Sequence, residues 1–186
     1  MKEDIIQALI VLKAGGVILY PTDTIWGLGC DATHGAAVRK VFNIKRRVDS
    51  KSMLILLDTP SKLSSYVRVP DIAWDLIKVS NSPLTLIYPG AKNLAPGLIA
   101  QDGTTGIRIT KDPFCSQLIH ELGKPIVSTS ANISGTPPPA CFNEIREEIR
   151  KTVDYVVKWR QNENFRRQHS SIIKIEENGQ FIIIRK

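Results

Sequence analysis

The chain alternates between segments whose apolar residues have helical spacing and short apolar runs typical of strands. Apolar residues at positions 5, 6, 9, 10 and 11 have helical spacing, and Gly15-Gly16 follows as a stop signal, so the first segment predicts a helix. The run Val17 to Tyr20 predicts a strand. Pro21 ends this strand because proline has no backbone donor, and a second extended segment is expected near Ile25 to Cys30.

Helical spacing, apolar runs and capping residues also predict the remaining helices and strands. Helices are expected over residues 36–46, after Pro60, after Pro70, from Asp112-Pro113 to Gly123, and over residues 142–151. Strands are expected over residues 53–57, 84–88, 106–109, 126–128 and 153–157, and residues 159–169 form a polar, basic connection. The chain ends in a predicted hairpin, with the turn Asn178-Gly179 between residues 171–177 and 180–185. Because strands and helices lack a regular βαβ rhythm, we predict an α/β fold in one domain over residues 1–186, a twisted, mixed open sheet with helices on its faces.

Composition narrows the class of protein. With 186 residues, of which 42% are hydrophobic, the chain has the size of one compact domain. Its formal charge of +7 favours an anionic partner such as a nucleotide or RNA. It has no run of 18 apolar residues, and the acids Glu3 and Asp4 stand where a signal peptide would be basic. We therefore expect a cytoplasmic protein that does not contact a membrane.

Polar side chains in irregular backbone beside a predicted strand are candidates for a ligand site. The first group is Thr22, Asp23 and Thr24, directly after a strand. The alternative is a turn whose side chains bond only their own backbone. Residues 27–32 also match a loose dinucleotide-binding pattern, but six residues separate them from the strand, and the chain has no P-loop motif.

Basic residues form the second and third groups. Lys45-Arg46-Arg47 ends a predicted helix, where cations also favour the helix dipole and face water. If the helix unwinds there, Lys45 and Arg47 point the same way and can clamp a triphosphate. Arg108 lies within an apolar strand, so it needs an anionic partner, which is either a ligand carboxylate or an acid of the protein.

The fourth group is the loop over residues 127–139, with hydroxyls at Ser128, Thr129, Ser130 and Ser134 and an amide at Asn132. Such side chains suit contacts with phosphates and metal-bound water, and the proline run stiffens the loop. The alternative is an ordinary surface loop. The histidines have the spacing neither of metal ligands nor of a catalytic triad, which indicates structural or solvated roles for His34, His120 and His169.

Taken in order, these segments resemble the YrdC/TsaC family across nearly the whole chain. The resemblance rests on a PT[ED]xxxGLG stretch, a KxR motif, an arginine-containing strand, an SxN motif and a late Ser-Thr-like pair, here at Pro21–Gly29, Lys45–Arg47, Arg108, Ser130–Asn132 and Ser170-Ser171. It implies a twisted α/β sheet around a basic concave surface. It also implies an enzyme that combines L-threonine, bicarbonate and ATP into L-threonylcarbamoyladenylate and pyrophosphate, for modification of tRNA.

The resemblance implies two sets of site residues. Those implied for threonine are Thr24, Arg108, Ser128 and Ser170. Those implied for the nucleotide are Lys45, Arg47, Thr104, Ser130, Asn132, Pro138 and Arg185, with Lys45 and Arg47 as the catalytic cations. Mg²⁺ is implied as a cofactor that accompanies ATP without dedicated protein ligands. The implied partners are threonylcarbamoyl-transferase proteins and tRNA or double-stranded RNA.

The chain departs from the family pattern at Lys51 and Leu56, and a usual tryptophan-proline-glycine-proline run is reduced to Asn81-Ser82-Pro83. Lys51 replaces an asparagine, and Leu56 replaces a histidine found in some longer members, which affects one nucleotide contact and one threonine contact. Two alternative functions remain open. One is a domain that holds structured RNA without catalysis, and the other is carbamoyl-adenylate formation in hydrogenase maturation, where a related domain works inside a much larger protein. Threonine-dependent release of pyrophosphate from ATP distinguishes all three functions.

Overall fold

The fold is taken from a computed structural model, which describes residues 1–47, 53–163 and 168–186. These residues form nine strands, β1 Ile18–Tyr20, β2 Gly27–Gly29, β3 Leu54–Leu57, β4 Leu84–Tyr88, β5 Thr105–Ile109, β6 Ile126–Ser130, β7 Tyr155–Val156, β8 Ser171–Ile175 and β9 Phe181–Arg185. The α-helices are α1 Lys2–Lys13, α2 Gly35–Lys45, α3 Asp71–Val79, α4 Pro113–Leu122 and α5 Glu147–Thr152, and two 3-10 helices are η1 Pro60–Ser65 and η2 Phe142–Glu144.

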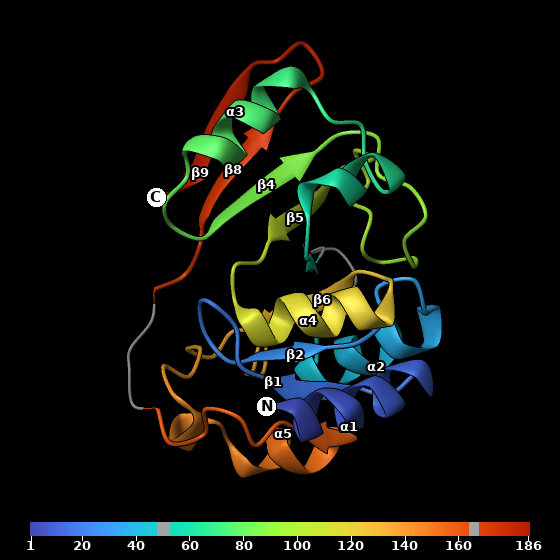
Figure 1. Cartoon of the computed structure of the whole chain (residues 1–186), viewed down its shortest axis with the longest axis vertical. Helices are drawn as coiled ribbons and strands as arrows, with labels where there is room; N and C mark the ends of the chain where they lie inside the picture. Colours follow the sequence, from blue (N-terminus) through green and yellow to red (C-terminus); the bar gives the residue numbers. More distant parts are fainter. Residues whose placement is uncertain (48–52, 164–167) are drawn as a thin grey trace.

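All nine strands in the described part of the chain belong to one mixed sheet (Figure 1), in the order β7-β1-β2-β6-β3-β5-β4-β8-β9. The pairs β1 with β7, β3 with β5, and β4 with β8 are parallel. The other neighbouring pairs are antiparallel, and β6 lies between β2 and β3 although it follows both by many residues. The predicted fold class, a mixed open sheet with helices, is therefore confirmed.

Capping side chains start two of the helices that pack on the sheet. Asp112 Oδ1 accepts a hydrogen bond from Cys115 N at 3.0 Å and caps α4, and Gly123 ends this helix with a φ of 71°. α1 packs against α4 and β1, and α4 contacts β3. His34 Nδ1 accepts from Ala37 N at 3.2 Å and caps α2, a structural role as expected. Figure 1 shows α3, β8 and β9 at one end of the molecule, with α1 and α5 at the other.

Several element boundaries differ from the prediction. β6 continues to Ser130, and the helix expected after Pro60 is a 3-10 helix. The helix expected over residues 142–151 is split into η2 and α5, with two residues between them. The final turn is one residue longer than predicted, because Glu176 N–H bonds Gln180 O at 2.8 Å and Gly179 takes a φ of 84°.

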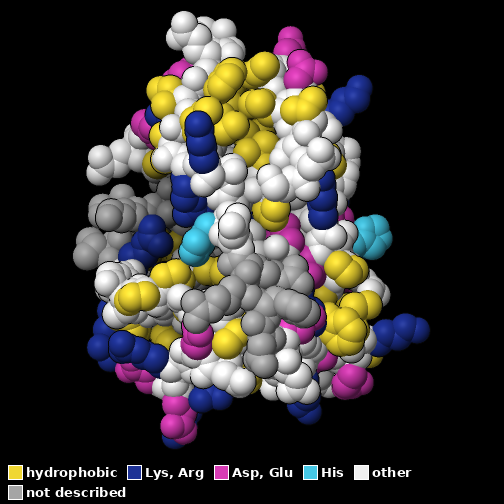
Figure 2. All heavy atoms as spheres, turned by 90° about the vertical axis from the view of Figure 1, so that its left-hand side faces the viewer, with side chains coloured by type: hydrophobic (Ala, Val, Ile, Leu, Met, Phe, Trp, Pro, Cys, Tyr) yellow, Lys and Arg dark blue, Asp and Glu magenta, His cyan; other side chains and the backbone are white. Residues whose placement is uncertain are grey.

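The last strand is the least covered element of the sheet. Its four apolar residues are 47 to 56% exposed, from Phe181 to Ile184. Figure 2 shows hydrophobic side chains gathered at the end of the molecule where α3, β8 and β9 lie. Among the described residues, no helix has the length and apolar content that a membrane span requires.

Gly29 in β2 has no side chain, so the Tyr20 ring and the Val127 carbonyl pack directly against its backbone. An added Cβ would lie 2.5 Å from Tyr20 Cε1 and 2.8 Å from Val127 O. Tyr20 is fully buried and its hydroxyl donates to the same carbonyl at 3.0 Å, so neither neighbour can move freely. We expect Gly29→Ala to lower the free energy of unfolding by about 1 to 3 kcal/mol, measured by urea denaturation.

Gly35 is the matched control, because its added Cβ would lie no closer than 3.6 Å to any neighbour and it starts a helix. We expect Gly35→Ala to leave stability unchanged or to raise it by up to about 1 kcal/mol. Equal effects of the two substitutions would contradict this description of β2.

Candidate active site

A cavity of about 370 Å³ lies over the centre of the sheet, bounded by β2, β3, β4, β5, β6, β8 and β9 and by the loop after β1. This volume is in the range of small-molecule sites. The polar residues that line it are mostly hydroxyl-bearing or cationic: Thr24, Arg47, Thr85, Thr104, Arg108, Ser128, Thr129, Ser130, His169, Ser170 and Arg185. None of the described residues that line the cavity is acidic, which favours an anionic ligand.

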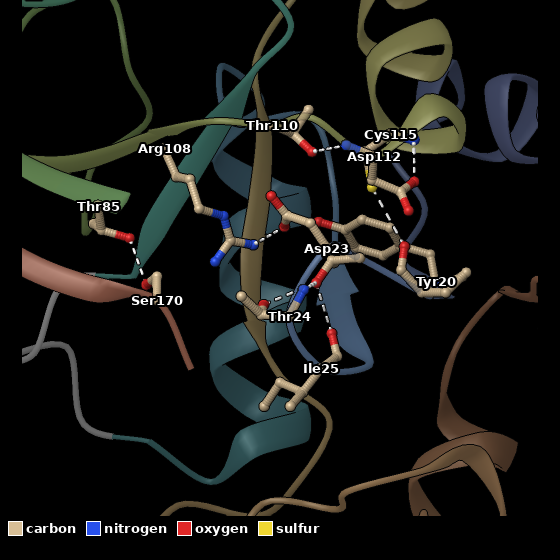
Figure 3. A network of polar contacts seen from close by, with 12 residues as sticks. Tyr20, Asp23, Thr24, Ile25, Thr85, Arg108, Thr110, Asp112, Cys115 and Ser170 are labelled. Carbon is tan, nitrogen blue, oxygen red and sulfur yellow. Dashed lines mark hydrogen bonds and ion pairs between the residues drawn. The ribbon is translucent and has the colours of Figure 1, made fainter. Parts of the chain in front are cut away.

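Arg108 is a buried cation in the wall of this cavity (Figure 3). Only 2% of the residue is exposed, and its Nη2 lies 3.1 Å from Asp23 Oδ1. Within the described part of the chain, neither Nε nor Nη2 has a hydrogen-bond partner of good geometry. Buried donors of this kind are costly to leave unpaired, and the planar guanidinium fits a carboxylate with two parallel bonds. Arg108 therefore has a protein acid beside it and donors that suit an anionic ligand.

The turn after β1 directs Thr24 into the cavity. Thr22 Oγ1 donates to Ile25 O at 2.8 Å and accepts from Thr24 N at 3.0 Å. Since the single hydroxyl hydrogen of Thr22 goes to Ile25 O, the contact of 2.9 Å between the two hydroxyls requires Thr24 to donate. The turn thus satisfies its own backbone through Thr22, as the alternative interpretation proposed, while Thr24 retains lone pairs that can accept from a ligand.

A hydroxyl pair lies on the opposite side of Arg108 from Asp23, as Figure 3 shows. Thr85 Oγ1 and Ser170 Oγ are 2.8 Å apart and buried. Thr85 is paired with Arg108 in the register of β4 and β5. Arg185 Nε and Nη2 both donate to Ser170 O, at 3.0 and 2.7 Å, so the last strand fixes the residue that precedes β8.

The Lys45 ammonium is buried and holds the loop after β6. Its Nζ donates to Ser130 O at 2.7 Å, to Asn132 O at 2.8 Å and to Asn132 Oδ1 at 3.2 Å. Ser130 Oγ also donates to Asn132 Oδ1, and Asn132 Nδ2 donates to Thr136 O. Lys45 and the loop after β6 therefore form one hydrogen-bond network, in which only Ser130 also lines the cavity.

Cationic and neutral groups share the cavity. Burial lowers the pKa of Arg47, and burial together with Arg108 lowers the pKa of Arg185. Burial, followed by the charges of Arg185 and Arg108, also lowers the pKa of His169. The imidazole of His169 is therefore neutral at physiological pH, while the arginines keep their charge because their ordinary pKa is so high.

The structure brings most of the predicted site residues together. Eight of them line the cavity: Thr24, Arg47, Thr104, Arg108, Ser128, Ser130, Ser170 and Arg185. Lys45 and Asn132 lie outside the lining, and Pro138 is exposed. Leu56 is fully buried in the core, and Lys51 lies outside the described residues. The roles of these residues in binding remain predictions.

Thr85, Trp26 and His169 also line the cavity, although the sequence did not predict them as site residues. The interpretation of His169 as structural or solvated is incomplete, and its position next to Ser170 was the only available signal. Thr85 gave no signal, because its location opposite Arg108 depends on which strands pair. Trp26 follows the Thr22–Thr24 turn but has the apolar character of a core residue, and it packs on Phe142 with ring centroids 4.9 Å apart.

Comparison with known proteins agrees with these features. A family model for Sua5, YciO and YrdC proteins, described as "Telomere recombination", matches residues 10–186. The threonylcarbamoyl-AMP synthase of Pseudoalteromonas translucida (strain TAC 125) is 35% identical over 157 residues, which cover 82% of this chain and 84% of the relative.

Two solved structures have the same fold. E. coli YciO matches with a TM-score of 0.86 and 26% identity, over 100% of this chain and 90% of that one. A variant of P. abyssi Sua5 matches with a TM-score of 0.88 and 25% identity, over 97% of this chain and 55% of that one. This chain therefore spans about half the length of the P. abyssi protein.

The buried ammonium of Lys45 gives a prediction about pH. Burial and, to a lesser degree, Arg47 lower the pKa of Lys45 from 10.5 to about 8 in the folded protein. Between these values the unfolded chain binds the additional proton, so the contribution of Lys45 to the free energy of unfolding should rise with pH. We expect the stability difference between the wild type and Lys45→Met to increase from pH 8 to pH 10 in urea denaturation. A difference that stays constant would contradict the lowered pKa.

Proposed function

Because the chain belongs to the Sua5/YciO/YrdC family, we propose that it is an L-threonylcarbamoyladenylate synthase, a nucleotidyltransferase that forms this product and pyrophosphate from L-threonine, bicarbonate and ATP. The observation that carries the proposal is the agreement between a relative named threonylcarbamoyl-AMP synthase and a cavity walled by a buried arginine. An amino acid carboxylate is the ligand that this arginine suits best.

The threonine end of the site is centred on Arg108. Its donors that have no hydrogen bond within the described part of the chain bind the carboxylate of threonine in a forked contact, and the ion pair with Asp23 holds the guanidinium from the side. Thr24 accepts a hydrogen bond from the ligand, since its own hydrogen is directed to Thr22. Ser128 and Ser170 supply further hydroxyls beside Arg108.

The nucleotide end is formed by Arg47, Arg185, Ser130 and Thr104, which line the same cavity. Arg47 and Arg185 neutralise the charge of the phosphates. Lys45 supports this end through the loop after β6, because its ammonium donates to the carbonyls of that loop. Asn132 and Pro138 lie on this loop and complete the nucleotide pocket as the loop adjusts to the ligand.

The reaction requires positioning and neutralisation of charge rather than a covalent nucleophile of the enzyme. A carbamate oxygen of N-carboxythreonine attacks the α-phosphorus of ATP, a phosphorus–oxygen bond forms, and the bond to pyrophosphate breaks. Arg108 fixes the nucleophile, and Arg47 stabilises the charge that develops on the leaving pyrophosphate. Neutral hydroxyls between the two ends orient the reactants without competing as anions.

Mg²⁺ is proposed to accompany ATP. The part of the chain that the structure describes has no group of three or more His, Cys, Asp or Glu residues that could hold a metal ion. The acid-free lining therefore fits an ion that is held by phosphates and water, with the hydroxyls of Thr129 and Ser130 near its water shell. When bound, the ion neutralises part of the triphosphate charge.

The wider partners are also part of the proposal. The product is a reactive mixed anhydride, so a transferase must accept the threonylcarbamoyl group and deliver it to tRNA. The formal charge of +7 supports direct contact with tRNA or double-stranded RNA, which should weaken steeply as the salt concentration rises. Catalysis in an enclosed cavity should be much less sensitive to salt.

The decisive experiment is an assay of pyrophosphate release from ATP with Mg²⁺, bicarbonate and threonine, in the absence of RNA, at low and moderate salt. Release that requires both threonine and bicarbonate, and persists at a salt concentration where RNA no longer binds, supports the synthase. Absence of release together with tight RNA binding would favour the RNA-binding domain. Release that does not depend on threonine would favour carbamoyl-adenylate formation.

Arg47 and Arg46 form a matched pair for the nucleotide end. Arg47 lines the cavity, whereas the Arg46 side chain is 72% exposed and its Nη2 lies 3.7 Å from Glu148. Removal of a charge-assisted contact costs about 1.5 to 3 kcal/mol, so Arg47→Ala should slow adenylate formation roughly tenfold to a hundredfold. Arg46→Ala should change the rate less than about twofold. Equal, small effects would place Arg47 with the solvated residues of the helix end.

Arg108→Lys tests the threonine end. A lysine keeps the charge but cannot form the forked contact, so we expect the Kd for threonine to rise about tenfold or more. The Kd for ATP should change less than about twofold. Isothermal calorimetry with each ligand measures both values. Loss of ATP affinity with unchanged threonine affinity would move Arg108 to the nucleotide end.

A further inference from the structure

Arg160, which is not among the residues that line the cavity, links the loop that carries Thr24 to the loop that follows the strand of Arg108. Its Nη1 donates to Asp112 Oδ2 at 2.6 Å and to Thr22 O at 3.3 Å. Asp112 follows β5, which contains Arg108, and Thr22 precedes Thr24 by two residues in the turn after β1. One guanidinium group therefore spans the loop after β1 and the loop after β5.

The backbone around Arg160 is firmly held. The Arg160 side chain is only 11% exposed, and its Nε donates to Glu163 Oε2 at 2.7 Å. Just before it, Val157 N–H bonds the carbonyl of a β1 residue at 2.9 Å, and Lys158 N–H bonds Asp4 Oδ1 at 2.7 Å. Arg160 itself has a φ of 67°, a left-handed backbone conformation that residues other than glycine rarely adopt. Such a conformation persists only where the surrounding contacts over-determine it.

Both acceptors of Arg160 Nη1 are fixed by further bonds. The other oxygen of Asp112 caps α4, so this carboxylate cannot follow a displaced side chain. Thr22 is the residue whose hydroxyl orders the turn and receives the hydrogen of Thr24. A shift of Arg160 relative to Asp112 would therefore change where Thr24 lies relative to Arg108.

We infer that Arg160 is a positioning residue that sets the separation between Thr24 and Arg108, and thereby the affinity for threonine. The inference rests on the proposed function. Asp23 forms one ion pair with Arg108, which lines the cavity, and Arg160 forms a second with Asp112, and neither of these two residues lines it. The first ion pair joins the loop after β1 to β5, and the second joins the segment after β7 to the loop after β5. The bond from Arg160 to Thr22 O ties that segment to the loop after β1 as well. None of the residues in these contacts is among those proposed for the nucleotide end.

Arg160→Lys is the variant that tests this role. A lysine keeps the charge but cannot reach Asp112, Thr22 and Glu163 at once, so the two loops lose their shared anchor. Misplacement of a binding group by about 1 Å can cost up to a hundredfold. We expect the KM for threonine to rise roughly tenfold, with the KM for ATP and the kcat at saturating threonine changed less than about threefold. Arg160→Gln, which also lacks the charge, should raise the KM for threonine further.

The control is Arg146→Lys, because the Arg146 side chain is 61% exposed and makes only a contact of 3.5 Å with Glu148 among the described residues. It should alter neither KM. Thermal unfolding of each variant, followed by circular dichroism, separates stability from positioning, because assays are made well below the unfolding transition. A variant too unstable to assay by kinetics is compared by threonine calorimetry at low temperature.

The outcomes distinguish this inference from the proposed function. If the wild type neither binds threonine nor releases pyrophosphate, the proposed function fails and with it the premise. If the wild type is active and Arg160→Lys has an unchanged KM for threonine, the inference is overturned while the function stands. A parallel loss for threonine and ATP would also overturn it, because a general structural role affects both substrates.

Discussion

The arrangement of the whole site depends on the burial of one arginine in the middle of the sheet. The charge of a residue that is only 2% exposed must be compensated, and the acid that lies beside it, Asp23, comes from the loop after β1. The ion pair therefore holds that loop against β5. The hydroxyls of Thr24, Ser128 and Ser170 then gather around a cation that the core of the protein has already desolvated.

A second buried cation has a comparable role at the other end of the cavity. Lys45 uses its ammonium to bind carbonyls of the loop after β6, and so organises that loop from the C-terminus of α2. Lysine and arginine are suited to these different tasks. The compact ammonium collects acceptors from several directions, whereas the planar guanidinium keeps a flat edge for a ligand. Of the two cations in this motif, Lys45 therefore faces the protein and Arg47 faces the cavity.

Much of this fold could be predicted from local pattern, and the parts that could not share a physical cause. Periodicity and caps located α4 from Asp112-Pro113 to Gly123, because the interactions that start and stop a helix lie within a few residues. The position of β6 between β2 and β3 could not be predicted, since strand pairing depends on contacts between distant segments. Thr85 and Arg160 were missed for the same reason.

Motif recognition found the residues of the cavity more reliably than it found their orientation. Arg108 and Thr24 both line the cavity, because a strand and the turn after a strand leave few choices of direction. The interpretation of Lys45 as a phosphate clamp assumed that it points in the same direction as Arg47. In the structure the backbone at Arg46 takes a φ of 49°, and its two neighbours diverge, one toward the loop carbonyls and one toward the cavity.

The edge position of β9 has a consequence for how this protein responds to its ligands. β9 pairs only with β8 among the described strands, yet it carries Arg185, whose bonds fix Ser170 at the cavity. An edge hairpin opens with a smaller free energy than the centre of a sheet, and each opening removes a cation and an anchored hydroxyl together. Local opening of β9 is thereby coupled to ligand binding in the cavity. An anion bound there slows the hydrogen exchange of the β9 backbone amides.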